Sequence, residues 1–324
     1  MHTGEKQDRK ITPSVSIIVP VYSCTEYITE ALDSILAQTF SDFEIIVVND
    51  GSPDSDELEK ALMPYQSRIR YIRQDNRGAA AARNTALRIA TAPVVAFLDA
   101  DDVWLPNFLA EQINFIEKTG ADLVYSDALL IGDSPLAGRT YMETAPSHGE
   151  VTAKSLLGLD CNVMTSGVVA RRALVMQVGM FNEAIKRAHD FDLWVRLAKH
   201  GAHLAYQRKV LLKHRLLESG LSGNLLSQYQ RALHVLETIP QRVDLTLQEQ
   251  NVLAKSLKKV AAGFHLEQGK IYLLEKNFVG AVEAFSASNR SRRSWKVHTV
   301  LVGLRLAPQL LWCLYSRRVS SSSS

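Results

Sequence analysis

Three carboxylates follow an apolar run within four positions, because Asp99, Asp101 and Asp102 come directly after residues 92–98. Such a run is typical of a buried parallel strand, and open α/β sheets bind ligands at the carboxyl edge of these strands. Acids this close repel one another unless a raised pKa, a basic neighbour or a cation relieves the repulsion. An Asp-x-Asp pair suits a hard divalent ion that bridges a diphosphate, so the pattern predicts a metal-assisted site.

An acidic turn before a helix is the alternative interpretation, since Pro106 suits a first helical position and Gly120 suits the position after a helix end. Asp50 adds an independent signal, because it follows a second strand-like run over 43–48. Taken alone, Asp50 and the glycine and serine after it form a tight turn. Carboxyl ends of parallel strands lie at one edge, so the two acidic turns together predict a single cleft lined with carboxylates.

Strand-like and helix-like patterns alternate through the first half of the chain. Strands are expected over 15–19, 43–48, 69–72 and 92–98, and helices over 26–36, 54–63 and 77–90. This alternation implies right-handed crossovers and a mostly parallel sheet, so the fold class is α/β. No Gly-x-Gly-x-x-Gly turn follows the first strand, which argues against a dinucleotide-binding domain, and no Walker loop occurs.

Motifs in the correct order make residues 13–222 similar to the family 2 glycosyltransferases of the GT-A fold. They are residues 15–22, Glu26, 34–39, 44–52, 77–78, 82–84 and 97–102. The resemblance implies a Rossmann-like sheet and transfer of a sugar from a nucleoside diphosphate donor, with a UDP-sugar favoured, to an acceptor hydroxyl with inversion. It also implies a divalent metal, Mn²⁺ or Mg²⁺, and a place in cell-surface polysaccharide or glycolipid synthesis.

The resemblance further assigns the donor site residue by residue. The donor-binding residues that it implies are Pro20, Tyr22, Glu26, Asp50, Gly51, Arg77, Arg83, Asp99, Ala100 and Arg215. The first three are expected to line the nucleoside pocket, and Asp50 is expected to accept a hydrogen bond from the base. Arg83 and Asp99 are expected in the ribose and diphosphate region. Asp101, assisted by Asp99, is the expected metal ligand.

The catalytic base is expected at Asp190, where the family has an acid that opens a helix facing the acceptor. The family's usual pair is Glu-Asp, and here His189 replaces the glutamate. In this interpretation Asp190 removes the acceptor proton, which requires an ionised carboxylate that is not fully solvated. The structural alternative is that Asp190 only caps the helix and Asp192 only complements its dipole.

A basic segment that closes over the diphosphate, commonly Tyr-Arg-x-His ending in Ser-x-Ser, is the last family element. Counted back from Ser222, Arg215 matches the arginine, and Leu217 stands where the histidine is expected. That departure puts the histidine's metal or phosphate contact in doubt. His214 is an alternative source of that contact, although a solvated loop histidine is the simpler expectation.

Beyond Ser222 the pattern becomes helical. Helices are expected over 225–236 and 247–264, followed by a helical hairpin over 265–287. The hairpin matches one tetratricopeptide-like repeat at Gly269, Tyr272, Ala281 and Phe285. Because such arrays normally need about three repeats to bury a core, residues 223–290 are expected to form a helical appendage on the catalytic domain.

The tail over 291–324 combines cations with apolar residues, and no Asp or Glu follows Glu283. The cations beyond that point are Arg290, Arg292, Arg293, Lys296, Arg305, Arg317 and Arg318. Pro308 and Gln309 interrupt the apolar stretch over 295–318, which argues against a spanning helix. An interfacial helix accounts for both features, and a dimer contact is the alternative. We therefore expect a peripheral protein on the cytoplasmic face of a membrane, facing a glycan or lipid-linked acceptor.

Composition sets the remaining limits. Of the 324 residues, 46% are hydrophobic and 22% charged, and a net charge of only +3 argues against a nucleic-acid binder. Three widely spaced cysteines indicate a reducing compartment rather than a disulfide framework. Residues 1–12 are polar, lack an apolar core segment and are expected to form a flexible arm.

Two other classes of function remain open. A nucleotidyltransferase also uses paired acids and a metal, but a glycine-rich phosphate loop is expected early in such a chain. An inactive scaffold acting through its helical part is favoured only if Asp99, Asp101 or Asp190 is missing, and all three are present. The motifs do not name the sugar, the nucleotide or the acceptor, because pocket shape sets those choices.

Overall fold

The computed structural model describes residues 12–186, 188–217 and 225–321. Within this part the chain separates into two compact units. The sheet unit contains the residues up to 152 and 161–215, and the helical unit contains 153–160 and the residues from 216 onward. Nearly all of the predicted N-terminal arm and the Ser-x-Ser end of the closing segment lie outside the described residues.

The sheet unit holds an eight-stranded sheet with the order β3-β2-β1-β4-β7-β6-β8-β5. Its strands are β1 (Val15–Val21), β2 (Phe43–Asp50), β3 (Ile69–Gln74), β4 (Val94–Phe97), β5 (Val103–Trp104), β6 (Leu123–Gly132), β7 (Val168–Arg171) and β8 (Leu204–Leu216). β1 pairs in parallel with β2 and β4, and β2 with β3. β7 runs antiparallel to β4 and β6. The predicted mostly parallel α/β sheet is confirmed, with antiparallel strands added by the second half.

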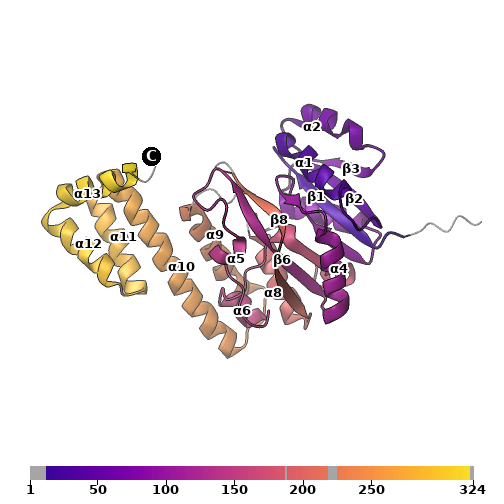
Figure 1. The fold of residues 1–324 in the computed structure, drawn as a ribbon. Coiled ribbons are helices and arrows are strands. Elements are labelled where there is room, and N and C mark those ends of the chain that lie inside the picture. Colours follow the sequence, from indigo (N-terminus) through magenta and orange to yellow (C-terminus); the bar gives the residue numbers. More distant parts are fainter. Residues whose placement is uncertain (1–11, 187, 218–224, 322–324) are drawn as a thin grey trace, which may run out of the picture. The chain divides into compact units, whose positions relative to one another are not determined.

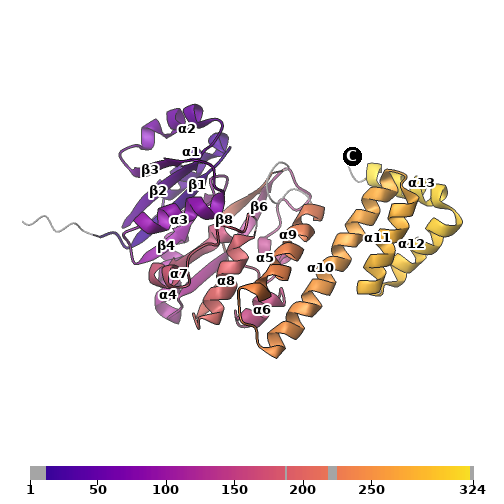
Figure 2. The same cartoon turned by 180° about the vertical axis from the view of Figure 1, so that it is seen from behind.

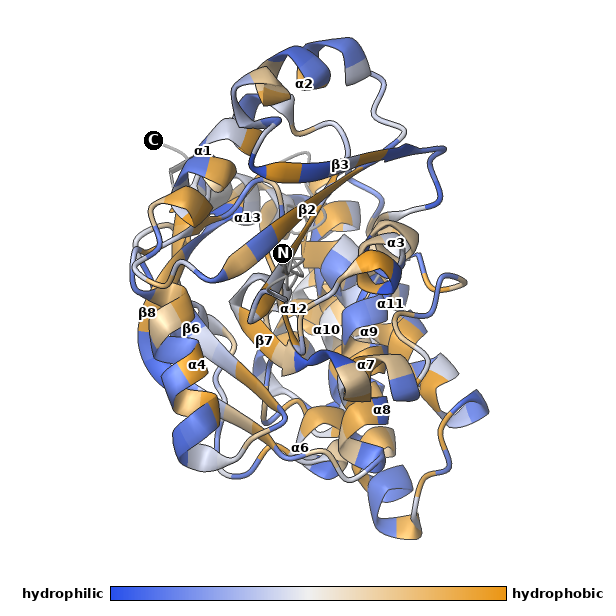
Figure 3. Ribbon diagram, turned by 90° about the vertical axis from the view of Figure 1, so that its right-hand side faces the viewer, coloured by the Kyte–Doolittle hydropathy of each residue, from blue (hydrophilic) through white to orange (hydrophobic). Residues whose placement is uncertain are grey.

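Helices cover both faces of this sheet. They are α1 (Thr25–Leu36), α2 (Ser55–Leu62), α3 (Ala79–Ile89), α4 (Phe108–Thr119), α5 (Tyr141–Thr144), α7 (Arg172–Gln177) and α8 (His189–Lys199), with 3₁₀ turns at Met63–Tyr65 and Thr165–Gly167. Ile28, Leu32 and Ile35 recur at helical spacing on α1 and share a core with Ile17 and Val19 of β1 and with α4. α3 packs on β1 and β2 from the other face, where Figure 2 also shows α7 and α8. β7 and much of β2 carry hydrophobic residues, whereas the turns of α2 are largely hydrophilic (Figure 3).

The first two strands extend beyond the expected ranges, and both extensions lead to the site. β2 continues to Asp50, which pairs with Gln74 of β3. β1 continues through Pro20, although proline cannot donate to a ladder. The β1–β4 ladder ends at Ile18, so at Pro20 only the β2 side still pairs.

The helical unit consists of α6 (Ala153–Leu157), α9 (Leu225–Thr238), α10 (Leu247–Leu274), α11 (Phe278–Ser291), α12 (Trp295–Leu306) and α13 (Pro308–Ser321), with a 3₁₀ turn at Ile239–Gln241. α10 packs against α9 and α11, and α12 packs against α11 and α13 (Figure 1). α10 is one helix of 28 residues, so the break expected after residue 264 is wrong. Its carboxyl-terminal half forms the first arm of the predicted hairpin. A Cβ added at Gly269 would lie 2.8 Å from Phe285 Cδ1, which explains the small residue at this crossing.

The predicted tail is continuous with this hairpin. Val297, Leu301 and Leu304 of α12 are buried together with Leu273 of α10 and Phe285 of α11. Some apolar residues of the tail are therefore core residues of the helical unit. The predicted interfacial helix depends on the other apolar residues of the tail, which are exposed. None of the helices in the described ranges is both long enough and apolar enough to cross a membrane.

Candidate active site

Asp99 follows the end of β4 and is held by a buried arginine. Arg83 of α3 is only 4% exposed, and its guanidinium donates through Nη2 to Asp99 Oδ1. Its Nη1 lies 2.6 Å from Nε2 of His189, the first residue of α8. Arg83 therefore joins the acid at the strand end to the helix that carries Asp190.

His189 is neutral at physiological pH. Burial, together with the positive charge of Arg83, lowers the pKa of His189 to about 4. Because Nε2 faces a guanidinium donor, we place the proton of the neutral ring on Nδ1. The residue that replaces the expected glutamate thus accepts a hydrogen bond from Arg83 without forming an ion pair.

Asp190 is oriented by the 3₁₀ turn that begins at Thr165. Thr165 Oγ1 donates to Asp190 Oδ2 at 2.9 Å, and Asp190 Oδ1 accepts from the N–H of Phe191 at 2.9 Å. Ser166 Oγ, in the same turn, accepts from the N–H of Asp99 at 3.1 Å. One turn therefore fixes both the expected base and the backbone of the first acid in the Asp-x-Asp pair.

That turn is anchored in the core of the sheet unit. Trp104 Nε1 donates to the carbonyl of Ser166 at 2.8 Å, and Gln112 Nε2 donates to the carbonyl of Gly167 at 2.6 Å. All of these residues are buried. The Asp190 contact is thus preorganised by the fold, as a catalytic group requires.

The capping alternative for Asp190 is wrong. The N-cap of α8 is Ala188, whose φ of 57° is left-handed and whose side chain makes no capping bond. Asp190 lies inside the helix, and its carboxylate contacts Thr165. Asp192 is fully buried and pairs with Arg196 at 2.8 Å one helical turn later, so it stabilises α8 itself.

The fully buried Asp102 pairs with the half-buried His214, a contact that the sequence did not indicate. Nδ1 of His214 lies 3.0 Å from both carboxylate oxygens of Asp102, and the N–H of Arg215 donates to the same carboxylate at 2.8 Å. Burial alone would lower the pKa of His214, but the charge and hydrogen bond of Asp102 raise it to about 9. The expectation of a solvated loop histidine is therefore wrong, because His214 lies on β8 and is charged at neutral pH.

Asp101 is the carboxylate that best fits a divalent cation. It is half-buried, and burial together with Asp102 and Asp99 raises the pKa of Asp101 to about 7. This excess of negative charge is what a bound cation relieves. Among the described residues, no group of three or more His, Cys, Asp or Glu side chains is placed to enclose a metal. Asp101 and Asp99 could therefore supply only part of a ligand set, and an ion held there would take its other ligands from a diphosphate and water.

Arg215 holds the loop that carries Asp101. Its Nε donates to the backbone carbonyl of Asp101 at 3.0 Å, and its Nη2 donates to Glu30 Oε2 at 2.6 Å. The guanidinium also lies 4.6 Å from the ring centre of Tyr27. The structure therefore places Arg215 beside Asp101, where its side chain ties the loop to α1.

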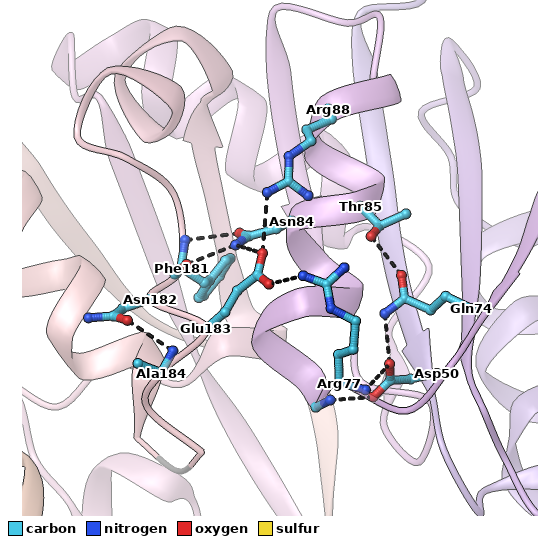
Figure 4. A network of polar contacts seen from close by, with 11 residues as sticks. Asp50, Gln74, Arg77, Asn84, Thr85, Arg88, Phe181, Asn182, Glu183 and Ala184 are labelled. Carbon is cyan, nitrogen blue, oxygen red and sulfur yellow. Dashed lines mark hydrogen bonds and ion pairs between the residues drawn. The ribbon is translucent and has the colours of Figure 1, made fainter.

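Asp50 receives three hydrogen bonds at the carboxyl end of β2 (Figure 4). Its donors are Gln74 Nε2 at 2.7 Å, the N–H of Arg77 at 3.0 Å and the N–H of Gly78 at 2.7 Å. Gly51 follows with a φ of 67°, and a Cβ there would lie 2.6 Å from the backbone nitrogen of Asn76. Glycine is required at this position because the two loops approach so closely.

Glu183 links α3 and the turn before it to the segment before α8 (Figure 4). It accepts from Arg77 Nη2 at 2.5 Å, Arg88 Nη2 at 3.2 Å and Asn84 Nδ2 at 3.0 Å. Asn84 also exchanges two hydrogen bonds with the backbone of Phe181. The hydrogen bond from Asn84, reinforced by Arg88 and Arg77, lowers the pKa of Glu183, so this carboxylate is ionised.

The expected nucleoside residues lie around the end of β1. Pro20 is half-buried, Tyr22 is 49% exposed, and Glu26 is exposed in the first turn of α1. Cys24 lies between them, and burial together with Asp101 and Asp99 raises the pKa of its thiol to about 12. The thiol is therefore unreactive. The effect of Asp101 and Asp99 on its pKa also shows that the turn after β1 lies close to the acids after β4.

The residues that orient the side chains and loops of the site could not be recognised from the sequence. Thr165, Ser166 and Glu183 carried no signal, because a threonine, a serine or a surface glutamate is common in any chain. The sequence pattern grouped Asp102 with the neighbouring acids, although its carboxylate is fully buried and pairs with His214. Only an observed long-range contact distinguishes such residues.

Two solved structures have a fold similar to that of this chain. Staphylococcus aureus TarS 1-349, in complex with UDP-GlcNAc, has a TM-score of 0.62 and 20% identity, covering 95% of this chain and 92% of its own. The mannosyltransferase PcManGT from Pyrobaculum calidifontis, in complex with GDP-Man and Mn²⁺, has a TM-score of 0.60 and 18% identity, covering 97% and 87%. At these identities the likeness shows the fold alone, which is that of the GT-A glycosyltransferases.

The sequence comparisons then place the chain. The model of glycosyl transferase family 2 matches residues 16–178. The Escherichia coli UDP-Glc:alpha-D-GlcNAc-diphosphoundecaprenol beta-1,3-glucosyltransferase WfgD is 32% identical over 224 residues, which are 68% of this chain and 85% of that protein. The chain belongs to glycosyl transferase family 2.

Other relatives are much longer than the matched region. An uncharacterized glycosyltransferase of Rickettsia felis is 30% identical over 243 residues, which are 71% of this chain but 39% of that protein. Two further Rickettsia glycosyltransferases are matched over only 31% and 37% of their lengths. The chain therefore spans between 31% and 39% of the length of these relatives.

Proposed function

We propose that the protein transfers a sugar from a nucleoside diphosphate sugar to an acceptor hydroxyl, with inversion at the anomeric carbon. The observation that carries this proposal is the 3₁₀ turn at Thr165 and Ser166. Thr165 donates to the carboxylate of Asp190, and Ser166 accepts from the backbone N–H of Asp99. A base and a donor-binding acid are thereby fixed relative to each other. Such fixation lowers the entropic cost of bringing two substrates together.

The donor is proposed to lie along the carboxyl edge of β1, β2 and β4. Asp50 accepts from the base, and Pro20, Tyr22 and Glu26 surround the nucleoside. The residues proposed to contact the rest of the donor are Gly51, Arg77, Arg83, Asp99, Ala100 and Arg215. A UDP-sugar is favoured, because the names of TarS and WfgD specify UDP-GlcNAc and UDP-Glc.

Asp101 and Asp99 are proposed to hold Mn²⁺ or Mg²⁺ together with the donor diphosphate. When bound, such an ion supplies positive charge that stabilises the departing diphosphate. The fit is supported by the raised pKa of Asp101 and by the oxygen-only donor set. The Mn²⁺ in the complex of PcManGT is consistent with this choice.

In the proposed reaction Asp190 accepts the proton of the acceptor hydroxyl while its oxygen forms a bond to the anomeric carbon. The bond from that carbon to the diphosphate oxygen breaks, and the electron pair leaves with the diphosphate. Attack and departure take place on opposite faces, so one displacement inverts the carbon. Thr165 orients Asp190, and Arg83 orients Asp99.

The acceptor is proposed to be a lipid-linked or growing glycan at the cytoplasmic face of a membrane, in polysaccharide or glycolipid synthesis. The name of WfgD specifies a GlcNAc-diphosphoundecaprenol acceptor, which supports a lipid-linked substrate. The cations and exposed apolar residues of α12 and α13 support a peripheral membrane location.

A panel of sugar nucleotides tests the proposed reaction class. The purified protein is incubated with each donor and Mn²⁺, with and without a short lipid-diphosphate sugar, and the released nucleotide is identified. Release of nucleoside diphosphate with one donor, increased by the acceptor, is expected. Release of sugar 1-phosphate, with transfer of the nucleoside monophosphate, would indicate the nucleotidyltransferase alternative. Failure of every donor to bind or react would favour the inactive scaffold.

A further inference from the structure

The helical unit contains a basic hollow that the proposed transfer reaction does not use. It has a volume of about 770 Å³ and lies where α11 ends and α12 begins. Arg290 and Arg293 line it together with His298 of α12, and Leu301 contributes a buried apolar wall. A hollow of this size is in the range that holds small-molecule headgroups.

The charge of this region suits an anion. From residue 284 to the end the sequence contains no Asp or Glu, so the arginines of the hollow lie in a wholly cationic segment. Guanidinium groups present paired donors that match phosphate oxygens. The N–H of Ser294 donates to Asn289 Oδ1 at 2.8 Å, which fixes the link between the two helices and hence the backbone of both arginines.

An exposed apolar stripe begins at the same hollow. Trp295 lines the hollow and is 75% exposed, and Val302 and Leu306 follow it at positions that fall on one face of α12. On α13, Leu310 and Leu314 are exposed one helical turn apart. Tryptophan and leucine beside arginine are typical of a surface that enters the headgroup boundary of a bilayer. A site for free phosphate needs no such apolar border.

We infer that the hollow between α11 and α12 binds the phosphate of an anionic lipid headgroup, with Trp295 and the neighbouring leucines in the boundary of the bilayer. Arg290 and Arg293 bind the phosphate oxygens, and Trp295 lies at the depth of the headgroups. This inference rests on the proposed membrane location but not on sugar transfer, since neither donor nor acceptor takes part.

Point substitutions are required for the test, because deletion of residues 291–324 would remove Val297, Leu301 and Leu304 from the core of the helical unit. Binding of the full chain to vesicles of phosphatidylcholine, with and without phosphatidylglycerol, is measured by flotation. The pocket variant is Arg290→Gln with Arg293→Gln. The control is Arg305→Gln with Arg317→Gln, which removes the same charge from exposed positions outside the hollow.

Wild type is expected to bind only the vesicles that contain phosphatidylglycerol. Both variants lose the general attraction of two surface charges to the anionic vesicles. The pocket variant is expected to bind these vesicles about tenfold more weakly than the control, because it also loses at least one charge-assisted hydrogen bond to the headgroup phosphate. Brominated lipids should quench the fluorescence of wild type much more than that of Trp295→Phe. Donor-dependent nucleotide release without vesicles should be unchanged in both variants.

Equal affinities of the pocket variant and the control would overturn the site while leaving membrane binding intact. A wild type that ignores anionic vesicles would overturn both the site and the proposed location. If inorganic phosphate binds the hollow but anionic vesicles do not, the ligand is a soluble phosphate and the lipid assignment is wrong. None of these outcomes affects the assignment of Asp190 or Asp101.

Discussion

Cations of the sheet unit that lie near the strand ends are paired with acids of the same unit. Arg83 pairs with Asp99, Arg77 with Glu183, and Arg215 with Glu30. In the helical unit, by contrast, the helices beyond Glu283 carry arginines and lysine in a stretch that contains no acid at all. The paired charges of the sheet unit therefore fix the geometry of a site in advance, whereas the cations beyond Glu283 are suited to an anion from outside the chain.

The largest expected effect is at Asp190, and it tests whether the sheet unit is a catalytic site. Asp190→Asn keeps the size of the side chain but cannot take a proton. Turnover is expected to fall by about two to four orders of magnitude, the range for a positioned general base, with donor affinity near that of wild type. Steady-state kinetics and calorimetric titration of the donor measure the two quantities. Full activity in this variant would mean that the base lies elsewhere.

Phe285→Ala tests whether the two units are energetically separate. Phe285 is buried in the core of the helical unit, and removing its ring is expected to destabilise that unit by about 3 kcal/mol. Donor binding to the sheet unit should persist above the temperature at which the helical unit unfolds. Circular dichroism and donor titration over a range of temperatures check this, with Val279→Ala, at an exposed position of α11, as the control. Simultaneous loss of both signals would show that the units unfold together.

Acid sensitivity should come from the paired carboxylates of the sheet unit, above all from Glu44. Burial alone would raise the pKa of Glu44, but hydrogen bonds from Thr91 and Ser16, with Arg70, lower it to about 2. A folded-state pKa below the unfolded value of 4.5 means that this stability is present above pH 4.5 and is lost as the pH falls toward 2. Its size is at most about 3 kcal/mol.

Glu44→Gln should therefore be less stable than wild type at pH 7, and the difference should shrink between pH 4.5 and 2. Urea unfolding at several pH values measures it, and Glu117→Gln, an exposed residue of α4, serves as the matched control. A difference that stays constant with pH would contradict the assigned role of Glu44.

The smallest expected effect is at Thr165, which acts only through Asp190. Thr165→Val keeps the shape and removes the hydroxyl, so turnover should fall about tenfold with an unchanged donor KM. Thr165→Ser, which keeps the hydroxyl, should restore turnover. A fall in stability with no change in turnover would reduce Thr165 to a structural residue.

The same contrast between the units explains what could be predicted from the sequence. Alternating strand and helix patterns correctly predicted that Asp50, Asp99 and Asp101 lie at one edge of the sheet. The end of each strand is visible in the local sequence, and the carboxyl ends of parallel strands lie at the same edge. His214 and Thr165 depend on contacts 112 and 25 positions away, which no local pattern encodes.

In the helical unit, the sequence predicted a helix but did not show which of its faces is buried. The residues of α12 are apolar on more than one side, so the pattern alone did not distinguish buried Val297 and Leu304 from exposed Trp295 and Leu306. Only packing against α11 made that distinction. Periodicity thus reports that a helix forms, but a helix with apolar residues on several sides needs a known partner before its exposed face can be identified.

Nucleotide titration of an Asp101 variant tests whether the carboxyl edge of the sheet binds a nucleoside diphosphate together with a metal. UDP and GDP are titrated into wild type, Asp101→Asn and the surface control Glu117→Gln, with Mn²⁺ and again with chelator. We expect wild type and control to bind at least one of the two nucleotides only with metal, and Asp101→Asn to bind it at least about 100-fold more weakly. Equal binding by Asp101→Asn, or binding that chelator leaves unchanged, would show that Asp101 holds no metal-bound nucleotide.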